Sequence, residues 1–234
     1  MAGQGTIFRV TTNGAFTVLT NFVGTYGANP GATMTLGPDG CLYGSTFGGG
    51  LNGKGTVFKV TTNGALTTLV NFSAQTGGNP ASPLTFGPDG NLYGTASDGL
   101  NGTNLGNVFQ LTTNGVLTTL ARFVNTNGKQ PLTGVTFGPD GNLYGATCYG
   151  GPIGAGVIYR LKLRPTLSIN RNADGVVTLN VTTMPGATNQ LWATTDLSSD
   201  WTVLTTNVAT NVLFQFMDTN ASGAPAKFYR VSAP

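Results

Sequence analysis

The sequence predicts an all-β fold with about three four-stranded β-propeller-type blades, followed by a small β-sandwich. The run FGPDGNLYG at Phe86–Gly94 recurs around Asp39 and Asp140, at spacings of 50 and 51 residues. Each period holds four short stretches rich in β-branched and aromatic residues, which is typical of a propeller blade. Charged residues make up only 8% of the chain, and its 36 glycines suit short strands joined by tight turns.

Each repeat opens with a predicted β-hairpin, near residues 5, 55 and 106, with a partial copy at 156. In the first copy, Gly5–Val10 and Ala15–Phe22 flank Asn13-Gly14. Asn-Gly between two apolar runs predicts a type I′ turn, because both central positions of that turn need positive φ. The repeat domain therefore begins with the outer strands of a blade.

A loop of about eight to ten residues follows each hairpin and leads to the Pro-Asp-Gly turn. The strand ending at this turn, Ser82–Phe86 in the second repeat, is predicted to be the innermost strand of its blade. Chain direction then sends the Pro-Asp-Gly and Asn-Gly turns to one face, and the longer loops to the other.

The repeat resembles that of a known family. GTVFKVTTNGALTTLVNF at residues 55–72, followed by PLTFGPDGNLYGTASDG at residues 83–99, is similar to the choice-of-anchor tandem repeat GloVer-containing proteins. The resemblance covers roughly residues 5–163 and implies a bacterial, secreted or surface-anchored propeller with no defined activity. Such proteins commonly carry more than three copies, so ring closure by this chain alone is not expected.

The repeat stops at Arg164-Pro165, which predicts a repeat domain at 1–164 and a second domain at 165–234. The second part carries about six strand signals with cleaner alternation, as in an antiparallel sandwich. Residues 189–204 and 227–231 resemble immunoglobulin- or fibronectin-like modules.

Composition argues against several classes of function. The chain has no His, and all eight acidic residues are Asp, so the commonest general base and transition-metal ligand are missing. We therefore expect no enzyme, no catalytic or metal residues and no cofactor. The net charge of +3 is scattered singly, so no nucleic-acid partner is expected. Apolar runs are too short for a transmembrane segment, and the N-terminus shows no signal-peptide pattern.

Several recurring or reactive residues have structural interpretations. Repeated Asp39, Asp89 and Asp140 are expected to stabilise turns, because one carboxylate per turn falls far short of a calcium site. Repeated Tyr43, Tyr93 and Tyr144 are expected in core layers. Cys41 and Cys148 are expected as buried free thiols, with a disulfide as the alternative. Trp192 and Trp201 are expected in the sandwich core, with a sugar-stacking surface as the alternative.

The preferred functional hypothesis is a non-catalytic extracellular or cell-surface scaffold that presents loops from its propeller. The alternative is a carbohydrate-binding lectin, on a propeller or a β-trefoil, so the partner is a glycan or another protein. Ligand-binding residues are expected in the longer loops, because loops on a rigid scaffold usually carry function. The candidates are Tyr26, Asn29, Gln75, Asn79, Asp98, Asn101, Lys129, Gln130 and Tyr149.

The strand count predicts an incomplete ring. Counting from Gly5 gives a leading outer pair, two complete blades and a final set of three strands. Closed propellers have about four to eight blades, so three blades leave apolar flanks and strand edges uncovered. We expect self-association, as a homodimer forming a six-bladed ring or as a head-to-tail assembly.

Overall fold

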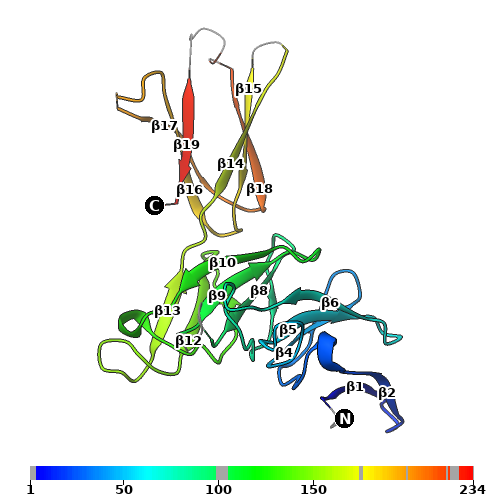
Figure 1. The fold of residues 1–234 in the computed structure, drawn as a ribbon. Helices are drawn as coiled ribbons and strands as arrows, with labels where there is room; N and C mark the ends of the chain where they lie inside the picture. The colour runs from blue at the N-terminus through cyan, green and yellow to red at the C-terminus, as the bar shows by residue number, and fades with distance from the viewer. Residues whose placement is uncertain are drawn as a thin grey trace. The chain divides into compact units, whose positions relative to one another are not determined.

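The computed structural model describes residues 4–98, 105–173, 176–198, 200–219, 221 and 227–233, and it is built of β-strands (Figure 1). The chain divides into two compact units. One comprises Met1–Thr136 and Tyr144–Arg160, and the other comprises Phe137–Leu143 and Leu161–Pro234. The predicted domain boundary after residue 164 stays a prediction.

The repeat region forms a series of small sheets in the described part of the chain. A leading pair, β1-β2, is followed by two four-stranded blades, β3-β4-β5-β6 and β7-β8-β9-β10, and by the three-stranded sheet β11-β12-β13. This confirms the predicted order, and four-stranded blades are not the arrangement of a trefoil. The strands are β1 (Thr6–Val10), β2 (Phe16–Asn21), β3 (Thr35–Leu36), β4 (Leu42–Thr46), β5 (Thr56–Val60), β6 (Leu66–Asn71), β7 (Thr85–Phe86), β8 (Leu92–Ala96), β9 (Asn107–Leu111), β10 (Leu117–Arg122), β11 (Thr136–Phe137), β12 (Leu143–Thr147) and β13 (Val157–Leu161).

The hairpin turns differ from the predicted type I′. Gly14 has φ of 84°, whereas Asn13 is absent from the non-glycine residues with positive φ. The Gly14 amide donates to the Thr11 carbonyl, and the Thr11 amide donates to the Ala15 carbonyl. These bonds close a three-residue loop in which only the glycine is left-handed, and the Thr11 hydroxyl accepts the Ala15 amide at 3.0 Å.

The innermost strands are shorter, and the loops before them longer, than predicted. In the second repeat, β7 spans only Thr85–Phe86, and residues 72–84 connect it to β6. Most of the predicted strand Ser82–Phe86 therefore lies in the loop. Ser82 bonds to the preceding blade, because its carbonyl accepts the Ser45 hydroxyl. Thr85 pairs with Tyr93 in the β7-β8 ladder, and its hydroxyl donates to the Val135 carbonyl next to the following sheet.

Neighbouring sheets are joined by a repeated aromatic contact. A phenylalanine that follows the outer strand of one sheet meets, edge to face, an aromatic ring on the third strand of the next. The pairs are Phe22–Phe58, Phe72–Phe109 and Phe123–Tyr159, with ring centroids 5.0, 5.3 and 5.0 Å apart. Apolar residues at 50-residue spacing thus build one core layer for each joint.

The second unit contains a β-sandwich of two three-stranded sheets, β14-β15-β18 and β17-β16-β19. Its core is formed by inward-facing residues such as Leu179, Val181 and Leu191, with Tyr229 and Val231 packed against them. The strands are β14 (Thr166–Arg171), β15 (Val177–Thr182), β16 (Thr188–Thr194), β17 (Thr202–Val208), β18 (Leu213–Asp218) and β19 (Phe228–Ser232).

The expectation that Trp192 and Trp201 belong to this core is wrong. Trp192 lies between buried Leu191 and Ala193 on β16, so strand alternation turns its ring to the outer face. The Arg230 guanidinium lies 5.0 Å from the Trp192 ring centroid and 4.6 Å from that of Trp201. Both rings are half-buried and cover an arginine instead of filling the core.

Candidate functional site

The two longer loops of each repeat meet through short backbone bridges. Ala28 pairs with Gly48, Gly78 with Asp98, and Lys129 with Tyr149. In the third repeat, the Lys129 amide donates to the Tyr149 carbonyl at 2.7 Å, and the Tyr149 amide donates back at 3.2 Å. The structure therefore brings together two of the predicted site residues, Lys129 and Tyr149.

A shallow pocket of about 300 Å³ lies at this bridge, and we call it the Tyr149 pocket. It is lined by the predicted residues Lys129 and Tyr149 and by Asn125, which lies in the 3₁₀ helix η3 (Asn125–Asn127). Tyr149 is 52% exposed, and the Lys129 ammonium lies 6.0 Å from the centroid of its ring. The remaining wall is glycine: Gly150, Gly151 and Gly154.

The glycines fold the loop back on itself. Gly150 and Gly151 have φ of 78° and 79°, and a Cβ at Gly151 would lie 2.4 Å from the Val157 side chain. The Gly151 amide donates to the Asn125 carbonyl at 2.7 Å, and the Gly150 amide donates to the Gly154 carbonyl. Because these glycine amides are already engaged in backbone hydrogen bonds, the polar side chains available among the lining residues are those of Asn125, Lys129 and Tyr149.

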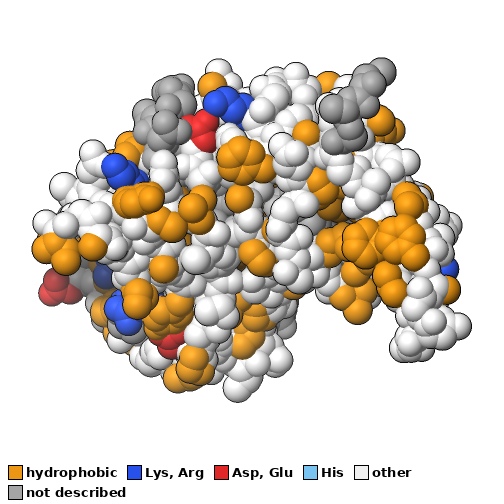
Figure 2. All heavy atoms as spheres, turned by 90° about the horizontal axis from the view of Figure 1, so that it is seen from below, with side chains coloured by type: hydrophobic (Ala, Val, Ile, Leu, Met, Phe, Trp, Pro, Cys, Tyr) orange, Lys and Arg blue, Asp and Glu red, His pale blue; other side chains and the backbone are white. Residues whose placement is uncertain are grey.

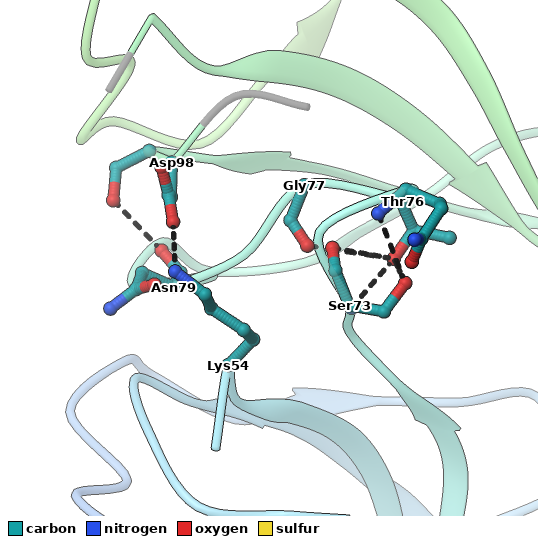
Figure 3. A network of polar contacts seen from close by, with 8 residues as sticks. Lys54, Ser73, Thr76, Gly77, Asn79 and Asp98 are labelled. Carbon is teal, nitrogen blue, oxygen red and sulfur yellow. Dashed lines mark hydrogen bonds and ion pairs between the residues drawn. The ribbon is translucent and has the colours of Figure 1, made fainter. Parts of the chain in front are cut away.

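The corresponding bridge in the second repeat carries an ion pair (Figure 3). Asp98 is buried, and one carboxylate oxygen accepts the Lys54 ammonium at 2.6 Å. Lys54 precedes β5, so this bond ties two consecutive blades together. The predicted site residue Asp98 is thus an internal link, because its carboxylate is directed at Lys54.

The predicted residues Asn29, Asn79 and Gln130 form a backbone clasp. They are the described non-glycine residues with positive φ, at 57°, 58° and 52°. In each, the amide donates to the carbonyl of a residue just before the preceding hairpin, and the carbonyl accepts an amide from the loop after the second strand of the following sheet. The amide acceptors are Gln4, Lys54 and Leu105, and the amides received belong to Phe47, Ser97 and Cys148. Their positions therefore have a structural explanation.

Two other predicted residues, Tyr26 and Gln75, are not among the residues that line the Tyr149 pocket. Tyr26 is exposed in the 3₁₀ helix η1 (Gly24–Tyr26), and its carbonyl accepts the Thr56 hydroxyl at 3.0 Å. Gln75 is exposed, and its amide donates to the Ser73 hydroxyl at 3.2 Å. Asn101 lies outside the described residues. That these residues bind a ligand stays a prediction.

Sequence reasoning missed Asn125 and the pocket glycines. The signal for the glycines was present, because a Gly-Gly pair follows the second strand at Gly49-Gly50 and again at Gly150-Gly151. Asn125 carried no comparable signal. It reaches the pocket because the loop after β10 folds onto the loop after β12.

The repeated Asp and Tyr residues have the expected structural roles where the structure shows them. The Tyr43 phenol donates to Asp39 at 2.9 Å, and the Tyr93 phenol donates to Asp89 at 2.8 Å. Burial, with a contribution from Asp39, raises the pKa of Tyr43 to about 12. The hydrogen bond from Tyr43 lowers the pKa of Asp39 below 3.8.

The two cysteines are free and differ in exposure. Burial, reinforced by Asp39, raises the pKa of the half-buried Cys41 thiol. Cys148 is exposed, so the expectation of a buried thiol is wrong there. Its position corresponds to Phe47 in the first repeat, which is also exposed because it lies beyond the end of the second strand.

The described residues contain no group of three or more His, Cys, Asp or Glu side chains placed to hold a metal ion. None of their helices is long and apolar enough to cross a membrane.

Comparison with known families places the repeat. The family model of the Gloeobacter/Verrucomicrobia repeat matches residues 1–223. The chain belongs to this family. No curated protein matches the sequence of this Gloeobacter/Verrucomicrobia repeat protein.

Two solved structures are similar to this repeat protein. The periplasmic gluconolactonase PpgL of Pseudomonas aeruginosa is 16% identical with a TM-score of 0.45, and the match covers 89% of this chain and 65% of that one. A functionally unknown protein from Desulfotomaculum acetoxidans is 16% identical with a TM-score of 0.34, covering 82% and 59%. The chain thus spans less than two thirds of either protein, and these distant likenesses carry no conclusion about activity.

Proposed function

We propose that this repeat protein is a non-catalytic interaction protein that presents loops from its propeller-type blades, outside the cell or at its surface. The observation that carries the proposal is the Tyr149 pocket. An exposed aromatic ring, an ammonium group and an amide lie around one hollow, on loops that are bonded to each other. Rigidly held loops of this kind are common binding sites.

The absence of a catalytic role is part of the proposal. It is supported by a sequence without His or Glu, which leaves few groups for acid–base chemistry near neutral pH. A screen for hydrolase and lyase activities tests this part. We expect no turnover above the buffer control, and a reproducible activity lost on substitution of Tyr149 would overturn it.

The location and the role of the sandwich rest on family resemblance. The repeat resembles surface-anchored proteins, and the sandwich resembles modules that serve as spacers or attachment points. Biotinylation of intact cells of the native host, with an amine reagent that does not cross membranes, tests the location. Labelling is expected, and a protein protected until the cells are lysed would overturn the extracellular location without affecting the binding proposal.

A glycan is the ligand class that the pocket itself favours, which makes the carbohydrate-binding alternative the second candidate. Sugars place apolar C–H faces on aromatic rings and hydrogen-bond through their hydroxyls. Tyr149 provides a ring with a polar tip, and Asn125 provides both a donor and an acceptor. Lys129 adds a positive charge, so we expect sugars bearing a carboxylate to bind better than neutral ones.

A glycan array followed by titration calorimetry tests the second candidate. We expect a defined set of acidic glycans to bind, Tyr149→Ala to abolish binding, and Lys129→Ala to weaken it and reduce its salt dependence. Phe47→Ala is the matched control, because it removes an exposed aromatic side chain from the corresponding loop of the first repeat, outside the pocket and outside the predicted ligand-binding residues. A blank array would remove the glycan hypothesis, and binding that survived Tyr149→Ala would show that the pocket is not the site.

A further inference from the structure

The joint between consecutive sheets has two distinct halves. β5, β9 and β13 are each the third strand of their sheet, and β1 is the equivalent strand in the leading pair. One face of this strand packs on the preceding sheet, as Phe58 packs in one cluster with Ile7 and Phe22. The opposite face packs on the following sheet, as Val57 packs in one cluster with Phe109.

The backward half of this joint is uncovered on β1. Phe8 is equivalent to Phe58 but is 52% exposed, whereas Phe58 is 1% exposed. Val10, Phe16 and Val18 are also exposed. Cross-strand pairing places Phe8 opposite Val18, and Val10 opposite Phe16, so the four side chains share one face of the β1-β2 pair.

This face is continuous and apolar. Phe8 and Phe16 stack with ring centroids 5.0 Å apart. Figure 2 shows hydrophobic side chains gathered on the side of the molecule where β1 and β2 lie. Contiguous apolar surface of this kind is typical of an interaction site.

The forward half of the joint is uncovered on β13. Ile158 is equivalent to Val57 and to Ile7, which are buried against the following sheet. Ile158 is 86% exposed, whereas its neighbour Tyr159 is packed against Phe123 on the other face of the same strand. The uncovered forward half on β13 is therefore the complement of the uncovered backward half on β1.

We propose that the β13 face of one copy of this chain docks on the β1-β2 face of a second copy, head to tail. The occupant is a second copy because the same chain carries both halves, and because each half is already used in the internal joints. Ile158 of one copy then packs against Phe8 of the other copy, as Ile7 packs against Phe58 within the chain. The contact is heterologous, so it closes into a ring of two copies or continues into a longer assembly.

The contact centres on β13 of one copy and β1 of the other, which are equivalent strands of the repeat. The last sheet, β11-β12-β13, has the inner strands of a blade, and the leading pair, β1-β2, has the outer ones. The proposal is independent of the ligand proposed for the Tyr149 pocket, because it uses none of the residues lining that pocket.

Light scattering on a sizing column and sedimentation velocity at micromolar concentration test the proposal. The wild-type chain is expected as a dimer or a larger head-to-tail species. Phe16→Asp and Ile158→Asp should each weaken association by at least about tenfold, because each buries an unpaired carboxylate in an apolar contact. Ile153→Asp is the matched control: Ile153 is 87% exposed but lies in the loop before β13, so association should not change.

Mixing the two disabled variants distinguishes this head-to-tail contact from a symmetric one. Phe16→Asp leaves the β13 face intact, and Ile158→Asp leaves the β1-β2 face intact, so an equimolar mixture should form a dimer of twice 24.0 kDa. Far-UV circular dichroism should show that both variants are folded, as expected for changes at exposed positions. A wild-type monomer at every concentration would overturn the proposal. So would unaltered self-association of Ile158→Asp, because it would mean that the β1-β2 face pairs with itself.

Discussion

Replacing the same residue at the same repeat position gives a direct measurement of the joint between sheets. Phe8 and Phe109 occupy equivalent places on β1 and β9. Phe109 is completely buried and meets Phe72 edge to face at 5.3 Å, whereas Phe8 is about half exposed. The free energy of unfolding should therefore respond very differently to Phe109→Ala and Phe8→Ala.

The magnitudes follow from the burial of the two rings. Truncating a fully buried phenylalanine to alanine costs about 3–5 kcal/mol, because the apolar contacts are lost and a cavity remains. Phe8 has buried only about half of its surface, and it stacks on Phe16, so Phe8→Ala should cost about 1 kcal/mol. We expect the two variants to differ by about 2–4 kcal/mol.

Urea unfolding with two signals provides the assay. Far-UV circular dichroism follows the whole chain, and tryptophan fluorescence follows the second unit, which holds both tryptophans of the sequence. Both variants should be made in the Ile158→Asp background, so that association does not contribute to the stability of the repeat unit. Equal losses for the two variants would refute the reasoning, because they would mean that Phe8 is as buried in solution as Phe109.

Three further predictions concern local features of the fold. The pKa of Tyr43 is raised to about 12 in the folded state, so folding favours the protonated phenol, and stability should fall as the pH rises from about 10 to about 12. Tyr43→Phe should flatten this part of the stability profile, raise the pKa of Asp39 as measured by NMR titration, and cost about 1 kcal/mol at neutral pH. An unchanged alkaline profile would contradict this prediction. Gly106→Ala should destabilise the protein more than Gly14→Ala in thermal unfolding, because both positions have positive φ but a Cβ at Gly106 would lie 2.3 Å from a proline ring; equal melting temperatures would show that the contact relaxes without cost. Cys148 should react with iodoacetamide in the native protein well before the second cysteine, and equal rates of labelling by mass spectrometry would contradict their assigned environments.

The repeat period and the turn residues of the sequence were enough to predict the blades. Asp39 and its equivalents were correctly predicted as turn residues, because Pro, Asp and Gly have strong local preferences at fixed turn positions. The hairpin turn type was wrong because Asn-Gly is compatible with two loop lengths. The longer one was selected where the Thr11 hydroxyl bonds the Ala15 amide.

The candidate site was only partly predictable. Lys129 and Tyr149 were correctly predicted to lie together, because alternate loops of an antiparallel sheet collect at the same ends of its strands. Asn79 and Asp98 belong to the same loops, but the structure uses one as a left-handed backbone clasp and the other as an ion-pair partner of Lys54. Those roles depend on which residue of the preceding blade lies opposite, and no local pattern contains that information.

The sequence by itself determined most of the strands and their order, though not the length of the innermost ones, because strand alternation and turn chemistry act between near neighbours in the chain. Only the tertiary structure decided which apolar residues are core. Phe8 and Phe58 lie in nearly identical local sequences, yet one is buried and the other exposed. The physical reason is that burial is a property of the neighbouring sheet: Phe58 has Phe22 and Ile7 against it, and Phe8 has no preceding sheet in the described chain.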